Sequence, residues 1–109
     1  MSSRSPIYSV AREFSRYPGG RLIAHGPYSG EDFRESVLKP LFDKYTLVTI
    51  DLSGTMGYGS SFLDESFGEM GRNLGFAEIQ RRLVLICNDD PTTVDLVWAK
   101  VSKACSAQS

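Results

Sequence analysis

The sequence predicts an α/β domain with the element order β-β-α-β-α-β-α and a four-stranded mixed sheet. Short runs of apolar and β-branched residues at 46–52 and 82–87 are typical of buried strands. Helical patterns separate these runs, and strands that alternate with helices usually become parallel neighbours. Nearer the start, the Pro-Gly-Gly sequence at 18–20 predicts a tight turn between strands at 7–10 and 21–25. This hairpin would add an antiparallel pair to the sheet.

The predicted helices begin at typical capping residues. Ser29 and Ser61 each stand three positions before an acidic residue, which is the S-x-x-[DE] pattern of a helix start. Asp90 is expected to cap the last helix, with Pro91 at its first position. Pro40 lies inside the helix that follows Ser29 and should kink or shorten it. The apolar positions expected to face the core are Phe33, Val37, Leu38, Leu41 and Phe42 in the first helix, Leu63, Phe67, Met70 and Leu74 in the central helix, and Val94, Val97, Trp98, Val101 and Cys105 in the last.

The composition is that of one globular domain, with a core at about 7–104 and loose termini, because 109 residues are 41% hydrophobic and 23% charged. The formal net charge of −1 gives no electrostatic basis for binding nucleic acid or an anionic membrane. The chain has no apolar run near the ~20 residues of a membrane span and no signal-peptide core, so we expect a cytoplasmic protein. One histidine and two distant cysteines form no metal-ligand pattern, and we expect neither a metal nor a cofactor.

The loop 54–61 (GTMGYGSS) suggests two kinds of catalytic site, one for nucleotide hydrolysis and one for a serine hydrolase. It nearly matches the phosphate-binding pattern G-x-x-x-x-G-K-[ST], but Ser60 occupies the lysine position, and a triphosphate would lose its main charge partner. A serine hydrolase needs a base, and the single histidine, His25, lies at a predicted strand end where nothing local orients it. Asp64 and Glu65 are ordinary partners of a helix dipole. We therefore expect no enzymatic activity.

Three glycines lie along one side of the central helix, at Gly68, Gly71 and Gly75. Each interior glycine costs roughly 1 kcal/mol relative to alanine, so three on one side indicate that another backbone approaches closely. Two alternatives stay open. The glycines pack against the protein's own sheet or a neighbouring helix, or they form part of a surface for a partner.

Four motifs carry a resemblance to a known family. They are the strand end 48–54 (VTIDLSG), Gly-Gly-Arg at 19–21, GPYSG at 26–30 and GYGSSFLDE at 57–65. The first, with the serine pair that follows, resembles STAS domains, the fold of bacterial anti-sigma-factor antagonists. The others resemble the bacterial STAS-like family of unknown function. The resemblance covers residues 7–104 and implies helices packed mainly on one face of the sheet.

The resemblance also implies a function. In the antagonists a partner kinase phosphorylates the second serine of a serine pair, and that place falls to Ser61 here, with Ser60 beside it. The expected activity is that of a non-catalytic regulatory module, which docks a kinase-like ATPase or another regulator through the loop 54–61 and the following helix. The residues expected to bind a partner or ligand are Gly57, Tyr58, Gly59, Ser60, Ser61, Asp64, Gly68 and Gly71. Neither the partner's identity nor the oligomeric state can be read from the sequence.

Two further expectations concern the start of the central helix. Ser61 should cap it by accepting a hydrogen bond from a backbone N–H near Asp64, which would contribute about 1 kcal/mol. Alternatively to partner docking, amide groups at this helix start could bind an anion, so that the domain senses a small molecule or nucleotide.

Overall fold

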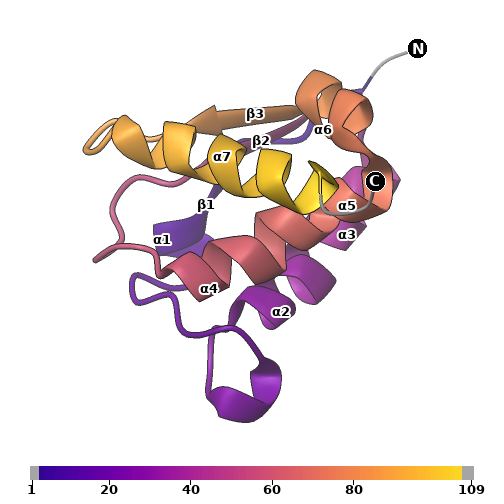
Figure 1. The fold of residues 1–109 in the computed structure, drawn as a ribbon. Coiled ribbons are helices and arrows are strands. Elements are labelled where there is room, and N and C mark those ends of the chain that lie inside the picture. The colour runs from indigo at the N-terminus through magenta and orange to yellow at the C-terminus, as the bar shows by residue number, and fades with distance from the viewer. Residues whose placement is uncertain (1–2, 107–109) are drawn as a thin grey trace.

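The computed structural model describes residues 3–106 and contains a small parallel sheet with helices packed against it (Figure 1). The strands are β1 (Tyr8–Ser9), β2 (Val48–Asp51) and β3 (Leu83–Ile86), and β2 lies between the other two. Both strand pairs are parallel, with Tyr8 beside Ile50 and Ile50 beside Leu85. The strand predicted at 46–52 is therefore the central strand.

The helical segments are short, but most of them join end to end. In chain order they are α1 (Val10–Glu13), the 3₁₀ helix η1 (Ile23–His25), α2 (Gly30–Phe33), the π-helical segment η2 (Arg34–Leu38), α3 (Lys39–Lys44), α4 (Ser60–Leu63), the π-helical segment η3 (Asp64–Gly68), α5 (Glu69–Leu74), α6 (Phe76–Arg82) and α7 (Thr92–Ser106). Two long helices result, 30–44 and 60–74, each with a π-helical segment in its middle. None of the described helices is long and apolar enough to cross a membrane.

The fourth strand predicted at 21–25 does not form, so the sheet has three parallel strands and the prediction of a mixed, four-stranded sheet was wrong. The carbonyls of Gly20 and Arg21 accept hydrogen bonds from the backbone N–H groups of Gly30 and Glu31, at 2.8 and 3.0 Å. The first N–H groups of a helix have no partner within it. The start of α2 thereby uses the backbone groups that a strand would have offered to a neighbour.

β1 is shorter than the strand predicted at 7–10, because the chain turns into a helix after Ser9. The Ser9 hydroxyl accepts a hydrogen bond from the backbone N–H of Arg12 at 3.3 Å. The Glu13 carboxylate in turn accepts one from the backbone N–H of Ser9 at 2.8 Å. This reciprocal capping starts α1 at Val10.

The sheet buries one of its two faces. In β2, Val48 and Ile50 are fully buried, whereas Thr49 and Asp51 point to the opposite face and are partly exposed. Val84 of β3 lies on that opposite face and is 40% exposed. The two long helices and α7 cover the buried face (Figure 1). The core consists of Val10, Phe33, Val37, Leu38, Phe42, Val48, Ile50, Leu52, Phe62, Leu63, Phe67, Met70, Ile79, Leu83, Cys87, Val97 and Val101.

Pro40 does not end the first long helix, which continues to Lys44. The backbone N–H of Lys39 donates to the carbonyl of Arg34, five residues earlier, and this wide turn directly precedes the proline. A proline removes one backbone hydrogen bond and crowds the preceding turn. The wide turn accommodates it, so the expected kink or shortening takes the form of a π-helical segment.

Candidate functional site

The loop 54–61 connects β2 to the second long helix and lies beside the first turns of α7 (Figure 1). Gly54 and Gly57 have φ values of 89° and 119°, in the region that favours glycine. Gly59 has an extended backbone and passes the chain into α4. Glycines thus allow both bends of the loop.

Hydrogen bonds fix this loop to the rest of the domain. The Asp89 carboxylate accepts one from the backbone N–H of Gly54 at 2.9 Å. That bond, together with the contact from the Cys87 thiol, lowers the pKa of Asp89. In the middle of the loop, the backbone N–H of Met56 donates to the carbonyl of Arg16 at 2.8 Å. The loop is therefore held at its start and near its tip.

Tyr58 secures the second half of the loop from inside. Its side chain is half-buried against Phe62, and its hydroxyl donates to the carbonyl of Leu52 at 2.8 Å. Burial raises the pKa of the Tyr58 hydroxyl well above its ordinary value. The uncharged Tyr58 side chain therefore restricts the movement of the second half of the loop.

Ser60 and Ser61 are exposed at the start of α4, but Ser61 does not cap the helix, contrary to expectation. The N-cap lies two residues earlier than predicted, at Gly59, and the helix has no side-chain capping bond. Ser61 therefore already has helical backbone geometry, from which its hydroxyl cannot reach the N–H of Asp64 as an N-cap would. Its hydroxyl instead accepts a hydrogen bond from Arg21 at 3.4 Å.

Two cations flank the serine pair from distant parts of the chain. Lys100 of α7 donates to the hydroxyl of Ser60, and Arg21 to that of Ser61. Asp64 lies between the two cations, 3.4 Å from the Arg21 guanidinium and 3.7 Å from the Lys100 ammonium group. The sequence analysis did not include Lys100 or Arg21 in the site. Each lies about 40 positions from the serine that it contacts, and only the fold brings them together.

Apolar side chains are exposed on the same side of the molecule. Met56 is 75% exposed in the loop, and Leu96 of α7 is 43% exposed. A hollow of about 500 Å³ lies between loop and helix, lined by Tyr58, Thr93 and Leu96 among others. Leu96 does not belong to the predicted apolar stripe of the last helix. An apolar residue outside such a stripe is the sequence feature that could have indicated its exposure.

Gly68 and Gly71, in contrast, do not lie on an open surface. Both are buried, and both face α7. A Cβ added at Gly71 would lie 2.8 Å from Cγ1 of Val101, and one at Gly68 would lie 3.6 Å from Cβ of Ala104. Of the two alternatives, the structure shows close packing against a neighbouring helix.

The described residues contain no group of three or more histidine, cysteine, aspartate or glutamate side chains that could hold a metal ion. His25, the single histidine, is exposed in η1, and its imidazole has no hydrogen-bond or ion-pair partner among residues 3–106 to orient it as a base. The candidate site is thus an exposed, anchored loop with a serine pair, two cations and two apolar side chains.

A parallel sheet covered on one face by helices, with a serine pair at a helix start, defines an α/β domain of STAS-like type. Residues 29–93 match the family described as STAS-like domains of unknown function (DUF4325), and the chain belongs to this family. The match includes β2, both long helices, the loop 54–61 and β3. Searches among curated proteins and solved structures found no match.

Proposed function

We propose that the domain is a non-catalytic regulatory module that docks a protein partner through its loop surface, formed by Met56, Tyr58, Ser60, Ser61 and Leu96. The exposure of Met56 carries this proposal, because a 75% exposed methionine stands on a loop held at both ends by hydrogen bonds. A preorganised apolar contact loses little freedom on binding and therefore favours association. By analogy with the STAS antagonists, the partner is a kinase-like ATPase or another regulator.

The serine pair supplies a means of control for this docking. Phosphate on Ser61 would add a charge of roughly −2 next to the Arg21 guanidinium and the first turn of a helix. Asp64 and Glu65 already pair with Arg21, at 3.4 and 3.5 Å, and would be displaced or repelled. The modification would therefore redistribute charge on the loop surface while the core underneath stays unchanged.

Site-specific photocrosslinking in the native cells tests the docking surface. A photoreactive amino acid at Met56 should yield a defined crosslinked partner, whereas the same group at Arg81, which is exposed on α6, should not. Leu96→Asp should abolish the Met56 crosslink. Equal crosslinking from both positions, or a crosslink that survives Leu96→Asp, would contradict docking through the loop surface.

Phosphorylation is tested separately. Mass spectrometry of the native protein should find phosphate on Ser60 or Ser61, and Ser61→Asp should weaken the crosslink while Ser61→Ala keeps it. Absence of phosphate, together with equal crosslinking by both variants, would remove the serine pair from the proposed function.

The second candidate is a sensor that binds an anion or nucleotide at the same loop. Lys100 and Arg21, on either side of the helix start, favour it, because both would attract a phosphate group. A ligand that binds only the folded state raises its melting temperature. ATP or inorganic phosphate should then raise the melting temperature of the wild-type protein but not of the Arg21→Gln/Lys100→Gln variant.

A further inference from the structure

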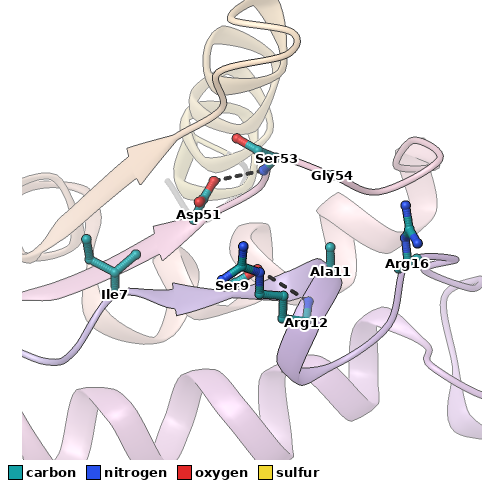
Figure 2. A pocket seen from close by; sticks show the side chains of 8 residues that line it. All are labelled: Ile7, Ser9, Ala11, Arg12, Arg16, Asp51, Ser53 and Gly54. Carbon is teal, nitrogen blue, oxygen red and sulfur yellow. Dashed lines mark hydrogen bonds between the residues drawn. The ribbon is translucent and has the colours of Figure 1, made fainter.

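A second hollow, of about 730 Å³, lies on the face of the sheet that the helices leave uncovered (Figure 2). It is located where β1 and β2 end, and its lining includes Ile7, Ser9, Arg12, Arg16, Asp51 and Ser53. Parallel sheets are normally covered on both faces, and ligands of open α/β sheets bind beyond the carboxyl ends of the strands. The hollow therefore lies where a ligand of such a sheet is expected to bind.

Two arginines on one side of the hollow have no acidic partner. Within residues 3–106, the guanidinium groups of Arg12 and Arg16 form no ion pair and no side-chain hydrogen bond. Arg21, Arg34 and Arg82, by comparison, each pair with a carboxylate. Arg12 lies on α1 and Arg16 on the turn after it, and Figure 2 shows their side chains on either side of Ala11, so that both positive charges border the same hollow.

The strand ends that line the hollow offer polar groups that are only partly used. Asp51 accepts a hydrogen bond from the backbone N–H of Ser53 through Oδ1, at 2.9 Å, and no other described residue donates to Oδ2, which can therefore accept another. The Ser53 hydroxyl accepts from the N–H of Asn88, and the Ser9 hydroxyl from that of Arg12. Both hydroxyls therefore keep a proton to donate.

We propose that this hollow binds a small organic anion. Its phosphate or carboxylate group pairs with Arg12 and Arg16 and accepts from the Ser9 hydroxyl. A hydroxyl or ammonium group elsewhere on the same molecule donates to Asp51. Arginine forks and a hydroxyl proton suit an oxyanion, and a free carboxylate oxygen suits a donor. The site is distinct from the serine pair and does not depend on the docking of a partner.

Binding of an anion in this hollow would also affect the loop 54–61. Gly54 lines the hollow, and the carbonyl of Arg16 accepts the hydrogen bond from Met56. A ligand that holds Arg16 in place therefore holds the residue that anchors the loop. Signals from Gly54 and Met56 should accordingly respond to binding at Arg12 and Arg16.

Titration followed by two-dimensional amide NMR tests the proposal, with glycerol 3-phosphate, lactate, inorganic phosphate and glycerol as probes at low salt. Glycerol 3-phosphate or lactate should shift the amides of Ser9, Arg12, Asp51, Ser53 and Gly54, and the comparison of these two probes distinguishes a phosphate from a carboxylate ligand. Glycerol, which has no charge, should shift none of them. Arg12→Gln/Arg16→Gln should weaken binding by at least about tenfold, the effect of losing charge-assisted hydrogen bonds.

Two further variants separate this site from its surroundings. Asp51→Asn should weaken binding of glycerol 3-phosphate but not of inorganic phosphate, which lacks the alcohol donor. Arg21→Gln/Lys100→Gln, which alters the serine pair, should leave both affinities unchanged. The spectra themselves report whether each variant is folded. The proposal is overturned if no probe shifts the five amides at concentrations up to about 10 mM, or if both double variants weaken binding equally.

Discussion

Arg34 Nη1 lies 2.6 Å from Glu65 Oε2, and the same guanidinium donates to the backbone carbonyl of Glu65. Both side chains are largely buried, with 13% and 15% of their areas exposed. Burial alone would lower the pKa of Arg34, but its hydrogen bonds with Glu65 and Glu35 raise it. The two residues belong to η2 and η3, so this pair joins the wide turns of the two long helices.

Arg34→Ala should destabilise the domain by about 2–4 kcal/mol, because it leaves the Glu65 carboxylate buried without its closest cation. Chemical unfolding with urea measures the loss directly. Arg81→Ala is the matched control, since Arg81 pairs with Glu78 on the surface of α6 and is 71% exposed. Its loss should stay within about 1 kcal/mol. Equal losses in the two variants would mean that the Arg34–Glu65 pair contributes no more than a surface pair.

Gly71→Ala and Gly68→Ala should differ, although both glycines belong to the second long helix and face α7. Alanine improves helix propensity at either site by roughly 1 kcal/mol. At Gly71 the new methyl group would meet Cγ1 of the buried Val101 at 2.8 Å, and overpacking of this kind costs about 1–3 kcal/mol. Gly71→Ala should therefore have the lower melting temperature of the two, and an equal temperature for both would contradict the packing of Gly71 on Val101.

Phe67→Ala should cost about 3–5 kcal/mol, because the ring is fully buried and contacts Phe33 in the core. Trp98 occupies a similar place in the predicted stripe of the last helix, but its side chain is only partly buried. Trp98→Ala should therefore cost less than Phe67→Ala. Urea unfolding of the two variants gives this order, and the reverse order would place Trp98 deeper in the core than the structure does.

The buried, hydrogen-bonded hydroxyl of Tyr58 should make the free energy of unfolding decrease at alkaline pH. Burial raises the pKa of Tyr58 above its ordinary value of 10.0, so the folded protein keeps a proton that the unfolded chain loses near that pH. Stability from this group is complete below about pH 10 and decreases as the pH rises further. Tyr58→Phe should cost about 1 kcal/mol near neutral pH through the lost hydrogen bond. The difference from wild type should shrink at high pH, and a constant difference would contradict the raised pKa.

Ser29→Ala and Ser61→Ala compare a capping serine with one that does not cap. Ser29 is fully buried, and its hydroxyl accepts a hydrogen bond from the backbone N–H of Asp32 at 3.0 Å, as its sequence pattern predicts. Ser29→Ala should cost about 1–2 kcal/mol. Ser61→Ala removes only the contact with Arg21 and should change the free energy of unfolding by less than about 0.5 kcal/mol. A similar loss of stability in Ser61→Ala would indicate that Ser61 caps the helix after all.

Local patterns predicted those parts of the fold that depend on local physics. The apolar run at 46–52 contains the central strand, the S-x-x-D pattern at Ser29 is a working cap, and the expected stripe of the central helix holds Leu63 and Phe67 in the core. In each case the residues that form the element are also the residues that stabilise it.

The errors arose where a distant element decided the outcome. The run 21–25 has the apolar character of a strand, but its neighbourhood supplies carbonyls to the N–H groups of α2. Strand propensity depends strongly on such context. The surroundings of Ser60 and Ser61 could not be predicted for the same reason, because Lys100 and Arg21 lie about 40 positions from the serines and contact them only in the folded domain.

The π-helical segment η3 determines how the length of the second long helix can change without changing which residues face the core. A π turn holds roughly one residue more than an α-helical turn, so the helix 60–74 resembles a regular helix with a single-residue insertion between Ser61 and Phe67. Deleting one residue within 64–68 would therefore give a uniform α-helix whose two ends keep their faces, and the serine pair would stay beside Lys100 and Arg21. Deleting one residue from an α-helical part of the same helix would instead rotate the serines by about 100° relative to the core-facing side. Relatives that lack one residue in this segment can therefore share the same loop surface.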